Sequence, residues 1–229
     1  MTNRPVALVT GATRGIGRAI AIELSSTHRI LVGGRDAARA RELVAELDDA
    51  APFVCDLADE DAVAAACAGI GRLDVLVHSA GIGRSNDIGL ASRALWREVF
   101  ETNVFAVADL TRLLLPALEA ARGIVVAINS GAGFFSSPGG GVYAGSKFAL
   151  RALTDALREE MRGKVRVCSI HPGRTDTDMQ RELQAAMGNE HYDGARYVAP
   201  ESVAAAVRLV VDTPDNATIE QLSIRPSVS

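Results

Sequence analysis

Cysteine is scarce in this chain of 229 residues, where Cys55, Cys67 and Cys168 are the only three. Their number is odd, no CxxC pair occurs, and no cluster of histidines accompanies them. We therefore expect reduced, buried thiols in a cytoplasmic protein, and neither disulfides nor a metal site.

Long apolar runs are also missing. The run near the N-terminus, within MTNRPVALVTGATRG, is five residues long and is too short for a signal peptide. No other stretch approaches the length of a membrane span. These features predict a soluble chain with no membrane partner.

Neither sign of charge dominates. The 24 Lys and Arg residues oppose 28 Asp and Glu residues, which leaves a net charge of −4. This balance gives no general attraction to nucleic acid, so any anionic ligand must be attracted by local arginines. A hydrophobic content of 48% suits one α/β domain with a substantial core, and we expect residues 1–229 to form it.

Short apolar runs alternate with helical stretches along the whole chain. Strands are expected at 5–10, 29–34, 51–57, 73–81, 123–131, 164–173 and 218–226, and helices at 15–26, 36–47, 59–69, 92–121, 142–161 and 200–212. Continuous apolar strands separated by helices indicate a single-domain Rossmann fold. This is a doubly wound parallel sheet of about seven strands with helices on both faces. Ligands in such folds bind beyond the carboxyl ends of the strands.

A glycine-rich turn, TGATRGIG at 10–17, joins the first expected strand to the first helix. Glycines at 11, 15 and 17 permit a tight turn and let backbone N–H groups approach a pyrophosphate. The helix N-terminus that follows adds unpaired donors and a positive dipole end. The alternative is a tight turn with no ligand. The glycine-rich turn follows the first of several expected strands, and this position favours a dinucleotide site.

Tyr143 and Lys147, in the stretch GVYAGSKFAL, lie four residues apart and share one face of a helix. A free tyrosine has a pKa of about 10. A nearby ammonium group lowers that value and makes the phenol a useful acid or base at neutral pH. The alternative is an ordinary helical pair, with the tyrosine packed in the core and the lysine in water.

Three motifs together, Thr10–Gly17, Tyr143-x-x-x-Lys147 and Pro172-Gly173, resemble the short-chain dehydrogenase/reductases over residues 5 to about 178. The resemblance implies a catalytic tetrad of Asn103, Ser130, Tyr143 and Lys147. In the tetrad, the serine hydroxyl would donate to a substrate carbonyl oxygen. The asparagine, expected within the long helix, would extend a proton path from the lysine.

The same resemblance implies the cofactor contacts. These are Gly11, Thr13, Arg14, Gly15, Ile16, Gly17, Arg35, Asp56, Leu57, Ser79, Ala80, Gly81, Tyr143, Lys147, Pro172, Gly173, Thr175 and Thr177. Asp56 would contact adenine, or else would only cap the next helix. The stretch HSAG at 78–81 departs from the Asn-Asn-Ala-Gly that is usual in the family, and we expect His78 to be a hydrogen-bonded histidine at a strand end.

The end of the second strand, VGGRD, bears on the choice of dinucleotide. Gly34 stands where the family's NAD enzymes carry Asp, and Arg35 follows it. With Arg14, it offers two guanidinium groups to a ribose 2′-phosphate, which arginine binds in bidentate fashion. The alternative is a solvated Arg35, with Asp36 accepting from the ribose hydroxyls. The sequence favours NADP(H).

The predicted reaction is hydride transfer between nicotinamide and a small-molecule carbonyl or secondary alcohol, with Tyr143 as the general acid or base. The alternative is a nonenzymatic NADP-binding regulatory protein on the same fold. Apolar residues at Phe134, Phe135, Met179, Leu183 and Met187 would line the substrate pocket, and 174–199 would form its lid. Arginines at 174, 181 and 196 either meet an acidic substrate or lie in solvent. The family resemblance implies a homodimer or homotetramer formed through the long helices.

Overall fold

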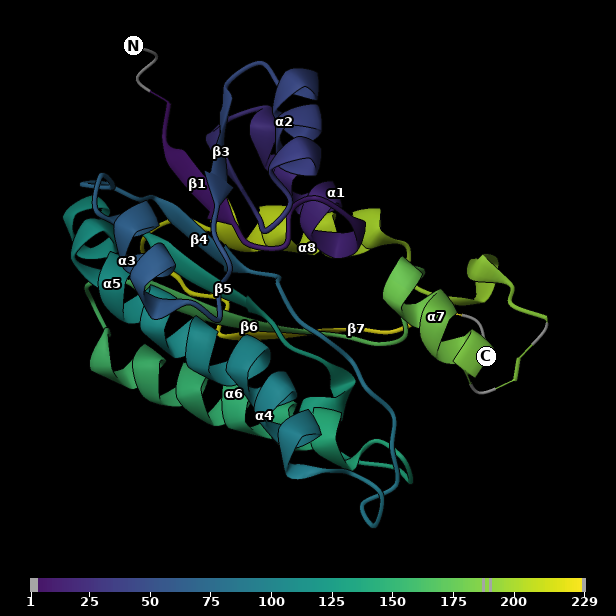
Figure 1. Ribbon diagram of the computed structural model, residues 1–229. Helices are drawn as coiled ribbons and strands as arrows, with labels where there is room; N and C mark the ends of the chain where they lie inside the picture. Colours follow the sequence, from purple (N-terminus) through teal and green to yellow (C-terminus); the bar gives the residue numbers. More distant parts are fainter. Residues whose placement is uncertain (1–3, 187, 190, 228–229) are drawn as a thin grey trace.

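The computed structural model describes residues 4–186, 188–189 and 191–227 (Figure 1). Its strands are β1 (Val6–Val9), β2 (Arg29–Gly34), β3 (Ala50–Val54), β4 (Val75–His78), β5 (Ile124–Ile128), β6 (Arg166–Pro172) and β7 (Gln221–Ile224). Its helices are α1 (Gly15–Ser25), α2 (Ala37–Glu46), α3 (Glu60–Cys67), α4 (Arg93–Phe100), α5 (Ala106–Ala121), α6 (Gly141–Glu160), α7 (Asp178–Ala186) and α8 (Pro200–Val211). The predicted alternation of strands and helices is confirmed.

The strands form one sheet in the order β3-β2-β1-β4-β5-β6-β7, and every pairing is parallel. The chain builds outward from β1 to β3 and then returns to the other side of β1. This reversal places a topological switch point between β1 and β4, at their carboxyl ends. The doubly wound Rossmann fold expected from the sequence is confirmed.

Helices cover both faces of the sheet because successive strand residues point to opposite sides. On β1, Ala7 and Val9 join one buried cluster with α1, α2 and α8, whereas Leu8 joins another with α3, α5 and α6. Figure 1 shows these two layers on either side of the strands. Cys55, Cys67 and Cys168 are free and buried within these clusters. No helix in the described ranges combines the length and apolarity that crossing a membrane requires.

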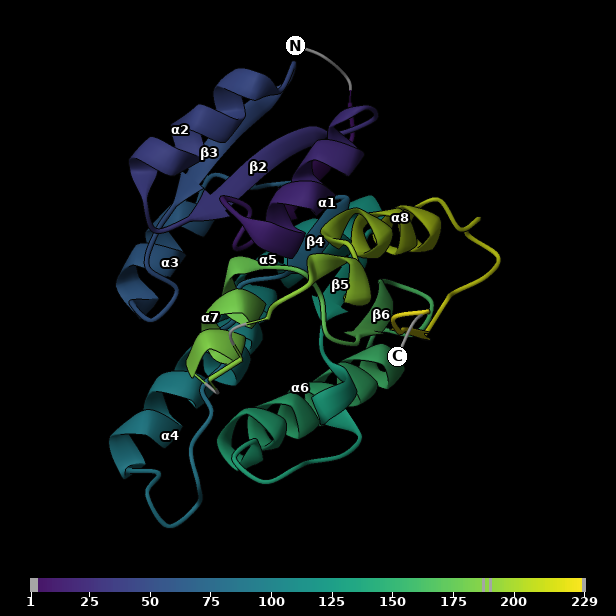
Figure 2. The ribbon, with the colours of Figure 1, turned by 90° about the vertical axis from the view of Figure 1, so that its right-hand side faces the viewer.

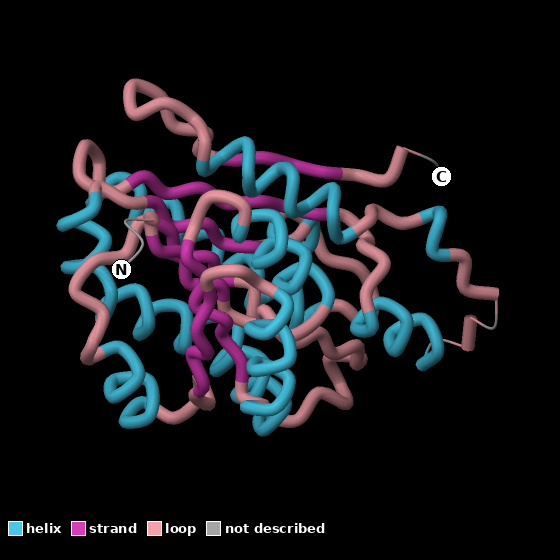
Figure 3. Tube along the Cα trace, turned by 90° about the horizontal axis from the view of Figure 1, so that it is seen from above, coloured by secondary structure: helices cyan, strands magenta, loops and turns pink. Residues whose placement is uncertain are grey.

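Two segments differ from the sequence expectation. The single long helix expected at 92–121 is divided into α4 and α5 by a π-helical turn, Glu101–Phe105. The segment 174–199, which shows no clear periodicity, contains α7 and a 3-10 turn at Gly194–Arg196. Figures 1 and 3 show α7 standing beyond the carboxyl ends of the strands, apart from the two helix layers, and Figure 2, turned so that this side faces the viewer, shows α7 in front.

Candidate active site

The glycine-rich turn after β1 lies directly against the segment that follows β4. The Ser79 and Ala80 N–H groups donate to the Thr10 hydroxyl over 3.0 and 3.1 Å. Gly11 has a φ of +63°, and a Cβ there would lie 2.9 Å from the Ala80 Cα. The turn therefore requires glycine both for its backbone conformation and for space.

Helix α1 begins at this turn, and no side chain caps its N-terminus. Arg14 occupies the cap position and makes no side-chain bond to the first helical turn. The N–H groups of that turn are therefore available to an anion, and the helix dipole favours negative charge there. A tight glycine turn followed by an uncapped helix fits a dinucleotide pyrophosphate.

The predicted adenosine end of the cofactor site lies beyond β2 and β3. The side chain of Arg35 is 76% exposed, and its Nη1 lies 4.0 Å from Asp56 Oδ2. The structure places these two predicted cofactor contacts next to each other. Asp56 also accepts from Ala58 N, but α3 is capped by Asp59, so capping that helix is not the role of Asp56. Leu57 is half-buried and packs against the core.

The acidic side chain that follows Arg35 is engaged as a helix cap. Asp36 caps α2, because its Oδ1 accepts from Ala38 N at 2.9 Å and Arg39 N at 3.2 Å. A Cβ on Gly34 would lie 2.8 Å from Thr13 Cγ2, so the Asp of the family's NAD enzymes would require the Thr13 side chain to move. The geometry suits a phosphate-bearing ribose better than a ribose held by a carboxylate.

The predicted catalytic serine and tyrosine line one cavity of about 770 Å³ at the carboxyl edge of the sheet. Ser130 follows β5, and its Oγ accepts from Ala132 N at 3.1 Å as a short 3-10 turn begins. Tyr143 lies in the first turn of α6, and its hydroxyl is near enough to the Ser130 side chain for the serine to favour the phenolate and oppose the rise of the tyrosine pKa. The two hydroxyl groups are therefore placed to contact one oxygen atom of a substrate.

Burial dominates the electrostatics of Tyr143 and Lys147. It raises the pKa of Tyr143 above its usual value, and the interaction with Ser130 opposes that shift without cancelling it. The Lys147 ammonium lies 5.7 Å from the centre of the tyrosine ring and donates to the Ile128 carbonyl over 3.0 Å. Desolvation therefore outweighs the Ser130 interaction, and the lowered tyrosine pKa expected from the Lys147 spacing is wrong for the chain by itself.

Burial should make Lys147 titrate well below an ordinary lysine, since it lowers the pKa of this group from 10.5 to about 8. The chain contains only one other lysine, Lys164, which is exposed. A ¹³C-lysine NMR titration, assigned with Lys164→Arg, should therefore show a Lys147 midpoint near pH 8. Between that pH and 10.5 the unfolded chain binds more protons, so this group's contribution to stability rises with pH. A midpoint above pH 10 would contradict the described burial.

Asn103 lies in the π-helical turn between α4 and α5 and is buried. Its Oδ1 accepts from Ile82 N at 2.9 Å, and its Nδ2 donates to Ile82 O at 2.9 Å and to Ser146 Oγ at 3.0 Å. A Cβ on the neighbouring Gly81 would lie 3.3 Å from Asn103 Oδ1 and 3.9 Å from Lys147 Nζ. Asn103 thus holds the segment after β4 beside Lys147. Its amide group binds the backbone carbonyl of Ile82.

His78 ends β4 and is fully enclosed. Its Nε2 lies 2.9 Å from Thr111 Oγ1, and burial lowers the histidine pKa to about 4. A neutral, hydrogen-bonded ring at neutral pH agrees with the structural role that the sequence predicts for it.

The turn after β6 brings Pro172 and Gly173 to the wall of the cavity. Thr177 lies beside the glycine turn, since a Cβ on Gly15 would be 3.4 Å from Thr177 Cγ2. Thr175 is 6% exposed, and its hydroxyl donates to the Gly173 carbonyl over 3.1 Å. The structure therefore directs Thr177 toward the glycine turn, whereas the Thr175 hydroxyl is used within its own loop.

Only some of the apolar residues predicted to line the substrate pocket do line the cavity. Phe135, Met179 and Leu183 line the cavity, together with Ile16 from the glycine turn. Phe134 instead packs against His171, with ring centroids 4.3 Å apart and the ring planes tilted by 41°. Met187 lies outside the described residues.

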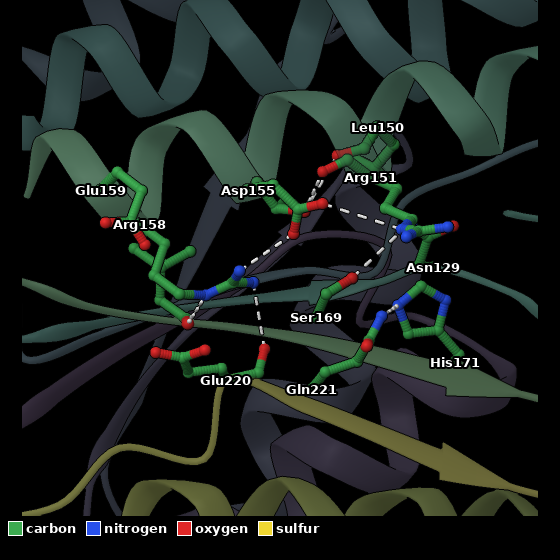
Figure 4. A network of polar contacts seen from close by, with 12 residues as sticks. Asn129, Leu150, Arg151, Asp155, Arg158, Glu159, Ser169, His171, Glu220 and Gln221 are labelled. Atoms are coloured by element: carbon green, nitrogen blue, oxygen red, sulfur yellow. Dashed lines mark hydrogen bonds and ion pairs between the residues drawn. The ribbon is translucent and has the colours of Figure 1, made fainter. Parts of the chain in front are cut away.

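A buried histidine that sequence reasoning missed supports the serine loop. His171 Nδ1 lies 3.0 Å from the Ser130 carbonyl oxygen, and Gln221 Nε2 lies 3.0 Å from His171 Nε2. Figure 4 shows the ring beside the Gln221 amide, with Asn129 and Ser169 next to it. Because Nδ1 donates to a carbonyl, the neutral ring can accept from Gln221.

Among the predicted arginines, only Arg174 lines the cavity; Arg181 is paired with Asp176 at 3.0 Å. Sequence reasoning missed two further lining arginines, Arg84 and Arg225. Arg225 follows the carboxyl end of β7, so the parallel order of the strands would have placed it at this edge.

Comparisons with known proteins agree with this geometry. The family profile described as short chain dehydrogenase matches residues 5–188. Serine 3-dehydrogenase of Agrobacterium fabrum is 34% identical over 233 residues, which cover 96% of this chain and 92% of the relative.

Solved structures share the whole fold. An alcohol dehydrogenase from Thermococcus sibiricus, complexed with 5-hydroxy-NADP, matches with a TM-score of 0.88 at 27% identity, over 99% of this chain and 98% of that chain. A metagenomic short-chain oxidoreductase in complex with NADP matches with a TM-score of 0.82 at 33% identity, over 98% of each chain.

Proposed function

Because the chain belongs to the short chain dehydrogenase family, we propose that it transfers a hydride between NADP(H) and a carbonyl or secondary alcohol carbon. The single observation that carries the proposal is the Ser130–Tyr143 pair, whose side chains interact in a cavity at the switch edge of the sheet. A nonenzymatic NADP-binding protein would have no need of this pair.

The cofactor would lie across the carboxyl ends of β1 and β4. The glycine turn and the first turn of α1 would hold its pyrophosphate, and Arg14 and Arg35 would hold the 2′-phosphate. Pro172, Gly173 and Thr177 would border the nicotinamide half. Support for NADP(H) comes from the arginine positions, from glycine rather than aspartate at position 34, and from the two NADP-type complexes among the similar structures. When bound, NADPH supplies the hydride.

The side chains would act on the substrate oxygen. Ser130 would donate a hydrogen bond that stabilises the developing alkoxide, and Tyr143 would deliver the proton. A raised tyrosine pKa keeps this phenol protonated at neutral pH, which favours the reducing direction. Lys147, buried beside the ring, would favour the phenolate left behind, and Asn103 would hold the backbone around it.

An NADPH-oxidation screen over ketones, quinones, 3-oxo esters and sugars tests the activity. We expect saturable turnover with at least one carbonyl class, and slower turnover with NADH at equal concentration. Tight NADPH binding without oxidation by any carbonyl would instead support the regulatory alternative.

We also propose that 174–199 forms a lid over the cavity. Met179 and Leu183 on α7 line the cavity, and α7 lies beyond the strand ends rather than in either helix layer. This arrangement lets α7 cover a bound substrate without disturbing the core.

A homodimer or homotetramer formed through α5 and α6 is the expected assembly. Phe105, next to α5, and Phe148 on α6 are 53% and 44% exposed, although both are large and apolar. Exposed apolar side chains of this kind mark association surfaces. Sedimentation velocity should give at least twice the mass of 24.0 kDa, and a 24.0 kDa species at micromolar concentration would contradict the assembly.

A further inference from the structure

The candidate cavity carries an unbalanced charge. Its described lining contains three arginines, Arg84, Arg174 and Arg225, and no aspartate or glutamate. The chain as a whole has 28 acidic residues and a net charge of −4. A cationic cavity in an acidic protein points to an anionic ligand.

The three arginines differ in the contacts that their guanidinium groups make. Arg84 is paired with Glu98 at 3.0 Å, and the Arg174 guanidinium lies over the Tyr197 ring at 5.4 Å. Arg225 makes no ion pair within the described part of the chain. Its Nη1 donates to the carbonyls of His171, at 2.6 Å, and Ile224, at 3.0 Å. The Nε–Nη2 edge of this guanidinium has no hydrogen-bond partner among the residues described, so it remains open to a ligand.

This open edge lies next to the catalytic serine. A Cβ on Gly131 would be 3.3 Å from Arg225 Nη2 and 3.6 Å from Phe135 Cζ, so the guanidinium rests against the residue that follows Ser130. His171 fixes the arrangement, because its carbonyl accepts from Arg225 and its ring bonds to the Ser130 carbonyl. The charge is therefore held at a defined place beside the reacting centre.

We propose that Arg225 binds a substrate carboxylate, so that the cavity accepts short oxo acids and their hydroxy acid products. This inference rests on the proposed function. Two parallel N–H groups match the two oxygens of a carboxylate and form charge-assisted hydrogen bonds. In the reaction, the carbonyl carbon gains a hydride from NADPH, its oxygen gains the Tyr143 proton, and the carboxylate leaves unchanged with the alcohol and NADP⁺.

The test compares acids with their methyl esters, which keep the carbon skeleton but lose the charge. The substrates are 2-oxobutanoate, 3-oxobutanoate and 4-oxopentanoate with their esters, and the proteins are the parent chain, Arg225→Gln and Arg225→Lys. At least one acid should exceed its ester by about tenfold in kcat/KM. Arg225→Gln should lower kcat/KM for that acid by about tenfold or more and leave kcat/KM for its ester within about twofold of the parent value. Arg225→Lys should lower kcat/KM for the acid less than Arg225→Gln does, because its ammonium keeps the positive charge but does not present two parallel N–H groups.

The acid-to-ester ratio is measured within each protein, so partial unfolding of a variant cancels. Arg97→Gln, an exposed arginine on α4 outside the cavity lining, removes the same charge and should leave the ratio unchanged. A second readout needs no turnover. Calorimetry with the NADP⁺-loaded protein should show butanoate binding at least about tenfold more tightly than butanamide, and Arg225→Gln should abolish that difference.

Each outcome has a distinct meaning. Equal use of acids and esters, or an equal loss of both in Arg225→Gln, overturns the carboxylate assignment and leaves the proposed function standing. Loss of NADPH binding in this variant also overturns it, since the arginine would then serve the cofactor. If no carbonyl of any kind is reduced, the proposed function fails, and this inference fails with it.

Discussion

Replacing Tyr143 with phenylalanine should lower kcat/KM for carbonyl reduction by about 10²- to 10⁴-fold, the usual contribution of a positioned general acid. The substitution removes only the hydroxyl that interacts with the Ser130 side chain at the cavity. The ring can keep its packing on α6, so NADPH affinity should stay within about twofold. Steady-state kinetics and NADPH fluorescence titration measure the two effects separately.

A matched control is Tyr197→Phe, which removes a phenol hydroxyl that belongs to the proposed lid segment but does not line the cavity. Tyr197 stacks on Tyr192, and the phenylalanine ring can preserve that contact. Turnover should therefore change little. If Tyr143→Phe turns over as fast as Tyr197→Phe, the acid–base role is wrong.

The pH dependence of reduction follows from the same burial. Because burial raises the pKa of Tyr143, the phenol stays protonated through neutral pH. The reductive rate should be level there and fall only at alkaline pH, as the proton donor is lost. Tyr143→Phe should lack that alkaline limb.

Removing the Arg35 side chain should have the second large effect, weakening NADPH binding by about ten- to a hundredfold while NADH binding changes by less than about twofold. The reason is geometric, since Arg35 is 76% exposed at the end of β2 and faces Asp56 across 4.0 Å. It is free to turn toward a 2′-phosphate. Dissociation constants for both dinucleotides, measured on Arg35→Ala and the parent chain, give the comparison.

Arg39→Ala offers a control on the same surface, because Arg39 is also exposed but lies 3.6 Å from Asp36, which caps α2. Arg39→Ala should weaken NADPH binding far less than Arg35→Ala does. An equal weakening of NADPH and NADH in Arg35→Ala would indicate that the site does not distinguish the phosphate, and NAD would then be the better assignment.

The sequence predicts the architecture and the switch edge well because both follow from backbone constraints. Gly11 must be glycine to permit a positive φ beside Ala80, and the alternation of Ala7, Leu8 and Val9 assigns each side chain to one face of the sheet. Such constraints act locally and are visible in the order of residues.

Features that depend on tertiary packing are harder to predict. The direction of the Tyr143 pKa shift depends on how far the tyrosine and Lys147 are removed from water, which spacing does not reveal. The π-helical turn around Asn103 depends on its bonds to Ile82 and Ser146 from other segments. Arg225 reaches the cavity only because β7 pairs with β6 in parallel, more than 80 residues after Tyr143.

The most direct test of the central claim is to follow deuterium from C4 of NADPH, labelled on either face, during a single turnover with a ketone found by the screen. The account predicts that one of the two labelled cofactors places deuterium on the alcohol carbon, at a rate reduced at least about a hundredfold in Tyr143→Phe. Alcohol product without label from either cofactor, or a label transferred equally fast by the variant, would contradict it.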